Sequence, residues 1–478
     1  MVEGFRENGL VKFLGIPYAK KPIGDLRWKR SQMVEPWEGV LEAKAYSEVA
    51  PQGNAMQLQG GEGCLTVNVL RPEEGDKLPV FVWIHGGGYN IGSCSDPMYH
   101  GDEFAKDGCV FVNFQYRLNV WGFYDLGMLP GCGHIESNRG LSDMITALKW
   151  IHENIACFGG DPERVTIAGE SAGGAAVMTL MAVPSVKGLF QQVIAESALC
   201  NCVMTRDYQK KIMPLFLKGM GWTEEDLPKL DTIDLKELVH GHNFVEGVLQ
   251  YEFPGTLECC PVIDDLLPER PLEALAKGAS EGVRLIIGTN KHEGSMFVRP
   301  EGTIFPNKWE MIREMFRRQG HADAYEKVKE YYSRPIHTEE YMTPFISFGG
   351  DYAFQMPSTK AAIAHSKYGD TRMFRYEYLS GGGIGSGLMV GHGMELPDVF
   401  GIDPCQFFGG EPEADQAKVR EAMHSTWVRY TKGEELPEWP LYSAADSELM
   451  IFNTESKAVK LDKTELMEVW GDMRFYEK

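Results

Sequence analysis

The stretch VTIAGESAGGAAV, residues 165–177, contains the pattern G-x-S-x-G around Ser171. The same pattern occurs a second time in KGASEG, around Ser280. In a chain of 478 residues with 53 glycines the pattern alone is a weak signal, so the sequence around each serine has to distinguish the two.

Ser171 follows an apolar, β-branched run at 164–169 and precedes an alanine-rich run. This order is typical of a strand, a strained turn that exposes the serine hydroxyl, and a helix. Ser280 has the opposite context, because it follows a short helical pattern that ends at Gly278 and precedes a strand-like run. We therefore predict that Ser171 is a nucleophile and that Ser280 lies in a loop.

Strand-like and helix-like segments alternate along much of the chain. Continuous apolar runs of this length are typical of strands that are buried on both faces. Further strands are predicted at 64–70, 80–85, 109–116, 191–197, 283–289, 371–379, 449–453 and 457–461. Apolar residues from Leu141 to Ile155 recur at spacings of three and four, which predicts an amphipathic helix, and a last helix is predicted near 464–473.

This alternation predicts the α/β class, with a mostly parallel central sheet and helices on both of its faces. We expect residues 1–478 to form one domain. A helical cap, or insertion, is predicted at roughly 205–365, where the chain becomes richer in helical patterns.

The bulk composition fits a globular enzyme, with 43% hydrophobic and 24% charged residues. The formal net charge of −21 disfavours nucleic acids and anionic membrane surfaces as partners. The N-terminus lacks the pattern of a signal peptide, and no apolar run approaches the ~20 residues that cross a bilayer, so we expect a cytoplasmic protein. Nothing in the sequence indicates an oligomeric state.

The ten cysteines do not form a disulfide or metal-binding framework in the sequence. Cys200 and Cys202 form one close pair and Cys259 and Cys260 another, but neither pair has the spacing of a typical metal site. We expect small buried thiols and no metal ion.

An attacking serine needs hydrogen-bond donors for the oxyanion. The segment WIHGGGYN, residues 83–90, follows a strand, and its glycines allow backbone N–H groups to converge on a carbonyl oxygen. We predict an oxyanion hole formed by Gly87, Gly88 and Ala172. His85 at the start of this segment is expected to hold the loop by hydrogen bonding rather than to act as a base.

The serine also needs a base and an acid that orients the base. In one known order of triad residues along the chain, the serine comes first, the acid second and the base last. Glu293 stands just beyond the end of a predicted strand, and we favour it over Asp264 and Asp265, which follow no clear strand.

For the base we predict His392, which lies in a glycine-rich loop. His424 and His365 lie in helical patterns, where a packed or exposed histidine is the usual explanation. The segment GGGIGSG, residues 381–387, is similar to a phosphate-binding loop, but no helix is predicted after it and no dinucleotide fingerprint accompanies it. We expect a flexible loop there and no cofactor.

Taken together, these motifs resemble the type-B carboxylesterase family, a branch of the α/β-hydrolases that includes cholinesterases and bacterial p-nitrobenzyl esterases. The similarity covers nearly the whole chain. It rests on FLGIPYAKKPIGDLRWK, GCLTVNVLRP, HGGGY, YRLNVWGF, FGGDPERVTIAGESAGG and GHGMELPDVFG. The resemblance implies an α/β-hydrolase fold and structural ion pairs between Arg27 and Glu62 and between Arg117 and Asp161.

The chain also departs from the family pattern. No cysteine precedes Cys64, so the disulfide of the extracellular members is not expected here, which fits a reducing compartment. The segment between residues 46 and 63 has no tryptophan, the residue type that holds a quaternary ammonium group in cholinesterases. Choline esters are therefore disfavoured.

The function that the resemblance implies is hydrolysis of carboxylic esters through a Ser-His-Glu triad and an acyl-enzyme, with a small-molecule ester as substrate. One alternative is a related acyl bond, namely an amide, carbamate, thioester or lactone. A second alternative is a non-catalytic adhesion or interaction protein, disfavoured because all three triad residues are present. We expect Trp121, Phe123 and Phe348 to line the pocket, together with residues near 200–260 and 295–350.

Overall fold

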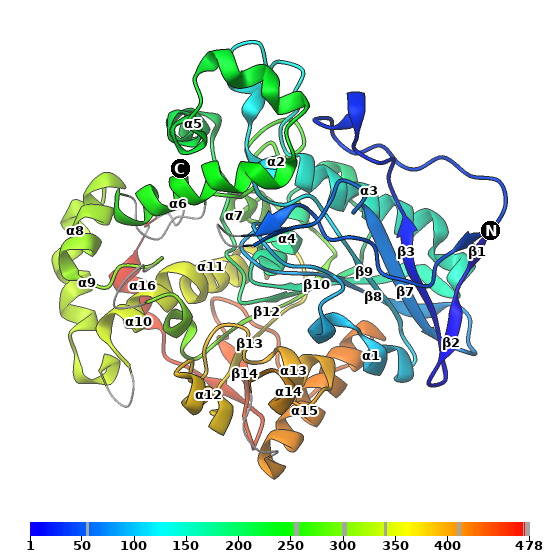
Figure 1. Cartoon of the computed structure of the whole chain (residues 1–478). Coiled ribbons are helices and arrows are strands. Elements are labelled where there is room, and N and C mark those ends of the chain that lie inside the picture. The colour runs from blue at the N-terminus through cyan, green and yellow to red at the C-terminus, as the bar shows by residue number, and fades with distance from the viewer. Residues whose placement is uncertain are drawn as a thin grey trace.

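A computed structural model describes residues 1–53, 57–252, 258–298, 304–338, 342–408, 413–471 and 473. Its main feature is a central sheet that has eleven strands within these residues (Figure 1). From one edge to the other the strands are β15 (Lys457–Lys460), β14 (Glu448–Phe452), β13 (Thr371–Tyr376), β12 (Arg284–Asn290), β11 (Gln192–Glu196), β10 (Gly160–Glu170), β8 (Leu78–Ile84), β9 (Val110–Phe114), β7 (Thr66–Pro72), β3 (Leu10–Pro17) and β2 (Phe5–Glu7).

The middle of the sheet is parallel. Every neighbouring pair from β9 to β14 is parallel, whereas β15 at one edge and β7, β3 and β2 at the other pair antiparallel. The predicted α/β class with a mostly parallel sheet is therefore confirmed. The strand bounds agree with those predicted from apolar runs to within a few residues.

The side chains of β8 show why these strands read as continuous apolar runs. Val80 and Val82 belong to one hydrophobic cluster, and Phe81 and Trp83 belong to a second cluster on the other face. Because successive side chains of a strand point to opposite faces, a strand covered on both sides needs apolar residues at every position.

Helices cover both faces. The helices α3 (Arg139–Asn154) and α4 (Ala172–Leu180) contribute to the first cluster, and α15 (Ala414–Thr431) contributes Trp427 to the second. Figure 1 shows α3 and α4 on one side of the sheet and α15 on the other. The predicted amphipathic helix that begins near Leu141 is α3.

The predicted helical segment at 205–365 contains α5 (Arg206–Met220), α6 (Leu238–Glu252) and, later, α8 (Trp309–Arg318) to α11 (Met356–His365). The sheet strand β12 also falls within this range, so the helices form two groups, one before and one after it. Figure 1 shows α5 and α6 packed side by side above α4. Residues 253–257, 299–303 and 339–341 of this segment lie outside the described residues.

One local prediction is wrong. The glycine-rich segment expected to be a flexible loop forms a short helix, α12 (Gly381–Ser386). Ser380 Oγ accepts a hydrogen bond from Gly383 N at 3.0 Å, and Glu413 Oε1 accepts one from Gly381 N at 2.7 Å. These two acceptors satisfy N–H groups at the start of the helix and compensate for its glycine content.

Of the two structural ion pairs that the resemblance implied, one is confirmed. Arg27 Nε lies 2.7 Å from Glu62 Oε1. The second pair is wrong, because Arg117 binds Asp143 through two nitrogen–oxygen contacts of 2.8 and 2.9 Å. The carboxylate of Asp161 instead accepts a hydrogen bond from Glu163 N.

Among the helices that the structure describes, none combines the length and the apolar character needed to span a bilayer.

Candidate active site

Ser171 occupies the junction between β10 and α4. Its backbone has φ 60° and ψ −122°, a conformation that L-residues rarely adopt, and its N–H donates to Glu196 O at 3.0 Å. A strained residue held by its surroundings between a strand and a helix presents its side chain outward. The predicted strand–turn–helix context of Ser171 is thus confirmed.

Close packing of α4 against the sheet sets the position of this turn. A Cβ atom on Gly173 would overlap Ile84 O, and one on Gly169 would lie 2.5 Å from the backbone of Gly173. Only glycine at these positions lets the first turn of α4 approach β8 and β10 so closely.

The expected oxyanion donors lie beside the serine. Gly87 and Gly88 have φ values of 104° and 63° and line the same cavity as Ser171. Within the described part of the chain, the N–H groups of Gly87, Gly88 and Ala172 have no hydrogen-bond acceptor. Unsatisfied N–H groups at a cavity wall and at a helix N-terminus are suited to bind a developing negative charge.

His85 stabilises the loop that carries these glycines. Its Nδ1 donates to Gly86 O at 2.9 Å, its backbone oxygen accepts from Tyr116 Oη at 2.8 Å, and its ring stacks on Tyr116. Burial lowers the pKa of His85 to about 4. These contacts confirm the role predicted for His85.

The predicted base and acid are in direct contact. His392 Nδ1 lies 2.7 Å from Glu293 Oε2, although the two residues are 99 positions apart in the chain. Glu293 follows the end of β12, as expected, and its other oxygen accepts from Ser197 Oγ at 2.6 Å and from Asn290 N at 2.7 Å. These bonds fix the carboxylate, which in turn fixes the ring and its tautomer.

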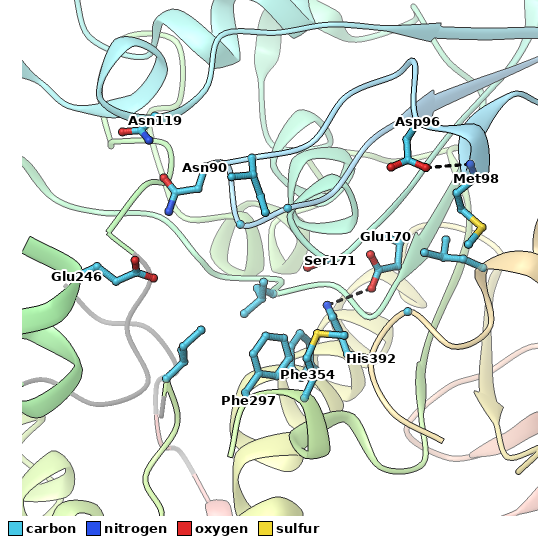
Figure 2. A pocket seen from close by; sticks show the side chains of 18 of the residues that line it. Asn90, Asp96, Met98, Asn119, Glu170, Ser171, Glu246, Phe297, Phe354 and His392 are labelled. Carbon is cyan, nitrogen blue, oxygen red and sulfur yellow. Dashed lines mark hydrogen bonds and ion pairs between the residues drawn. The ribbon is translucent and has the colours of Figure 1, made fainter. Parts of the chain in front are cut away.

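Sequence reasoning missed Glu170, the residue before the serine. Glu170 Oε1 lies 3.0 Å from His392 Nε2, and Figure 2 shows both side chains beside Ser171. Burial raises the pKa of Glu170 to about 7. Burial alone would lower the pKa of His392, but Glu170 and Glu293 together raise it to about 9. The only sequence signal for Glu170 was an acidic residue inside the G-x-S-x-G pattern.

Two more buried carboxyl groups, those of Glu395 and Glu196, lie close enough to Glu170 to interact with it electrostatically. Asn290 Nδ2 donates to Glu395, and Trp427 Nε1 donates to Glu196 Oε1 at 2.8 Å. Burial raises the pKa of Glu395 to about 8, and the pKa of Glu196 is also raised by burial. Burial therefore disfavours the charged form of both carboxyl groups.

Two aromatic rings flank the imidazole of His392. The ring centroids of Phe297 and Phe354 lie 4.9 and 4.6 Å from that of His392. Phe354 comes from a π-helical turn, Asp351–Gln355, that interrupts the helix between α10 (Pro344–Gly350) and α11. Such turns contain one more residue than an α-helical turn and often occur at functional sites.

The residues considered as alternatives for the acid and the base bind other groups. Asp264 and Asp265 bind the guanidinium of Arg30. The two histidines considered as alternative bases have other partners: His424 contacts Val399 O and Asp107, and His365 contacts Thr371 Oγ1.

Ser280 lies in the turn between α7 (Pro271–Ala276) and β12, with no contact to the candidate triad. It borders a separate cavity formed with the segment that follows α4. The prediction that Ser280 is a loop residue is confirmed.

The cavity at Ser171 has a volume of about 710 Å³. Trp121, Phe123 and Phe348 are fully buried and are not among its described lining residues, so the prediction is wrong for these three residues. The expectation that residues near 200–260 and 295–350 line the pocket is confirmed, for example by His242 and Phe305. The aromatic residues that line the described part of the wall are Phe297, Phe305, Phe354, Phe407, Phe408 and Tyr99.

Cys64 is a buried thiol without a disulfide partner. Within the described ranges, no group of three or more histidine, cysteine, aspartate or glutamate residues is arranged to hold a metal ion.

Acyl transfer to a serine hydroxyl is the chemistry for which this arrangement is suited, and the fold and the cavity together define a serine hydrolase of the α/β-hydrolase type. The chain belongs to the carboxylesterase family, whose family model matches residues 1–470. The protein is therefore a carboxylic-ester hydrolase, and the family acts through a Ser-His-Glu triad.

Curated relatives match the chain over nearly its full length. It is 34% identical to the para-nitrobenzyl esterase of Bacillus subtilis over 95% of this chain and 93% of that protein. It is 30% identical to the liver carboxylesterase of Sus scrofa over 96% of this chain and 88% of that protein.

Solved structures agree with this assignment. A structure titled PNB esterase superimposes with a TM-score of 0.87 at 32% identity, covering 98% of this chain and 97% of the other. A carboxylesterase of Geobacillus stearothermophilus superimposes with a TM-score of 0.83 at 28% identity, covering 98% of each chain.

Proposed function

We propose that Ser171 attacks the ester carbonyl, that His392 is its general base, and that Glu293 orients His392. The observation that carries the proposal is the meeting of distant segments at one cavity. Ser171 and His392 both line it, and Glu293 Oε2 lies 2.7 Å from His392 Nδ1.

In the first step His392 takes the proton of Ser171 as Oγ bonds to the carbonyl carbon, and the carbonyl oxygen becomes an oxyanion. The N–H groups of Gly87, Gly88 and Ala172 stabilise that oxyanion, and losing one such donor typically costs about 3 kcal/mol. His392 then gives the proton to the departing alcohol. Water repeats the same sequence on the acyl-enzyme and releases the acid.

A thioester is a second candidate substrate. The chain is 30% identical to a protein of Anas platyrhynchos named fatty acyl-CoA hydrolase, medium chain, over 97% of this chain and 88% of that protein. The same machinery would cleave amides, carbamates or lactones. The lining residues Asp96, Glu170, Glu246 and Glu258 make the cavity acidic and disfavour entry of a polyanionic substrate such as an acyl-coenzyme A, so we favour carboxylic esters.

We further propose that residues 1–478 act as one catalytic domain in the cytoplasm, with the helical segment at roughly 205–365 covering the pocket. The lining residues His242 and Glu246 of α6 support the covering role. Buried thiols such as Cys64 and Cys94 are suited to a reducing compartment. The net charge of −21 disfavours nucleic acid and anionic membranes as partners.

The test is covalent labelling with a fluorophosphonate, followed by peptide mass spectrometry. We expect a single adduct on Ser171 and loss of p-nitrophenyl ester hydrolysis in proportion to labelling. The Ser171→Ala variant should take up no label. An adduct on Ser280 in the active enzyme would refute the assignment.

A further inference from the structure

The face of α6 that borders the active-site cavity is polar, although much of the remaining wall is apolar. His242, Asn243 and Glu246 line the cavity from this helix. Since residues four apart lie on one face of a helix, His242 and Glu246 point the same way. Figure 2 shows the carboxylate of Glu246 directed into the cavity, near Asn90 and across from His392.

The described lining residues carry negative charge without a permanent positive charge. They include Asp96, Glu170, Glu246 and Glu258, whereas no lysine or arginine is found among them. Two of the four carboxylates have other roles: Asp96 accepts from Met98 N, and Glu170 faces His392. Glu246 lines the cavity from α6.

His242 does not neutralise Glu246. The shortest ion-pair distance of the Glu246 carboxylate is 4.0 Å, to His242 Nε2. That nitrogen also lies 2.5 Å from Asn90 Nδ2, an amide donor, while Nδ1 lies 3.0 Å from Tyr124 Oη. Asn90 and Tyr124 therefore occupy the two ring nitrogens, and neither nitrogen makes a close ion pair with Glu246.

Burial lowers the pKa of His242 to about 4, so the ring is neutral at pH 7. Burial also raises the pKa of Glu246. The Glu246 side chain is 31% exposed and lacks a cationic partner in the described structure, so a cation in the cavity would stabilise its charged form.

The position of Glu246 relative to the reacting atoms determines which half of an ester it meets. His392 must reach the oxygen of the departing alcohol, so the alcohol lies on the His392 side of Ser171. The carbonyl oxygen lies at Gly87 and Gly88. The acyl chain is then directed away from His392, and Figure 2 shows Glu246 on that side of Ser171.

We propose that Glu246 makes this enzyme selective for esters whose acyl chain carries a cationic group, such as an ammonium a few methylenes from the carbonyl. The proposal rests on the assignment of Ser171 and His392 made above. It differs from recognition of choline esters, in which the cation belongs to the alcohol and contacts an aromatic ring.

Two substrates of the same shape test the proposal. One is p-nitrophenyl 4-(trimethylammonio)butanoate, and the other is p-nitrophenyl 5,5-dimethylhexanoate, in which carbon replaces the quaternary nitrogen. Neither acyl chain can attack its own ester. The measured quantity is the ratio of kcat/KM for the cationic ester to kcat/KM for the neutral one.

In Glu246→Gln we expect this ratio to fall about tenfold, mainly through a higher KM for the cationic ester, as loss of one partly buried ion pair predicts. The neutral ester should change less than about twofold, because it makes no ion pair with Glu246. Glu237→Gln is the matched control, since it removes an exposed carboxylate just before α6 and should leave the ratio unchanged. An unchanged ratio in Glu246→Gln would overturn the proposal.

The wild-type enzyme supplies a second measurement that does not depend on how a variant folds. Raising the ionic strength from about 0.01 to about 1 M should lower the ratio, because salt screens the attraction between the ammonium group and the carboxylate. A ratio independent of salt would count against the proposal. Failure of the triad assignment would look different, because it would place the phosphonate label on a residue other than Ser171 whatever the charge preference.

Discussion

Glu170 Oε1 lies 3.0 Å from His392 Nε2, and Glu293 Oε2 lies 2.7 Å from the other nitrogen of the same ring. The imidazole is therefore held between two carboxylates. This arrangement favours the positively charged ring that forms when the histidine takes the serine proton, but it also makes the resting ring easier to protonate.

The first prediction follows from the raised pKa of His392, about 9. Only the neutral ring can accept a proton, and a raised pKa keeps the ring charged to higher pH. The kcat/KM for a neutral ester should therefore increase as pH rises from 7 towards 9.

Glu170→Gln removes one of the two charges that raise this pKa. In this variant the acidic limb of the plot of kcat/KM against pH should move to lower pH by at least about one unit. A shift of one unit corresponds to about 1.4 kcal/mol of lost interaction between Glu170 and the charged ring. Glu163→Gln changes an exposed carboxylate on the same strand and should leave the pH profile in place. A profile that does not move in Glu170→Gln would show that Glu170 does not act on the ring.

The second prediction concerns Glu293. Glu293→Gln should lower kcat by about 10³–10⁴-fold, because an amide neither stabilises the imidazolium nor holds the correct tautomer. Ser197→Ala removes one hydrogen bond to the same carboxylate and should cost about tenfold. Steady-state kinetics with a p-nitrophenyl ester measures both, and equal losses in the two variants would contradict this ranking.

The third prediction concerns the two G-x-S-x-G serines. Ser171→Ala should lose about 10⁴-fold or more in kcat while its Tm stays near that of the wild type, because the strained backbone remains and only a hydroxyl is removed. Ser280→Ala should retain full activity. Substantial turnover by Ser171→Ala would require another nucleophile.

The fourth prediction concerns the packing of α4. In Gly173→Ala the new Cβ would overlap Ile84 O, so the variant should unfold at a lower temperature by thermal denaturation. Gly385→Ala is the control: its Cβ would meet no atom within 4 Å, and alanine favours the helix α12. A Tm for Gly173→Ala equal to that of Gly385→Ala would refute the packing argument.

The fifth prediction concerns the buried ion pair between Arg117 and Asp143, whose side chains are both fully buried. Asp143→Asn leaves a buried guanidinium without its counter-charge and should lower the free energy of unfolding by about 3–5 kcal/mol. Asp161→Asn should change it little. If urea denaturation showed a larger loss of stability for Asp161→Asn than for Asp143→Asn, the result would favour the pair between Arg117 and Asp161 that the family resemblance implied.

Much of the sheet could be predicted from the sequence because strands covered on both faces must be apolar at every position, as in β8. The candidate triad was accessible for a related reason. Its members stand just after strands or in a glycine-rich loop, so that Ser171 and Glu293 were marked by their local context. The contact between Glu293 and His392 cannot be predicted from local sequence patterns, because the two residues are 99 positions apart in the chain.

The failures have specific physical causes. The helix α12 was missed because its stability comes from acceptors on Ser380 and Glu413, and glycine content alone disfavours a helix. The family resemblance implied a pair between Arg117 and Asp161, but the order of motifs along the chain does not show which carboxylate faces Arg117. Aromatic residues near the site were assigned to the cavity, whereas Trp121 packs in the core.

The position of Phe354 beside the imidazole of His392 depends on the number of residues in the π-helical turn at Asp351–Gln355. Deleting a single residue from this turn would restore the ordinary α-helical geometry. The residues that precede the deletion would then be rotated about the helix axis by about 100° relative to α11. Phe354 would then swing away from the imidazole, although every atom that takes part in bond making would be unchanged. In this enzyme one extra residue in a helical turn beside the reacting groups therefore contributes to how the imidazole is enclosed.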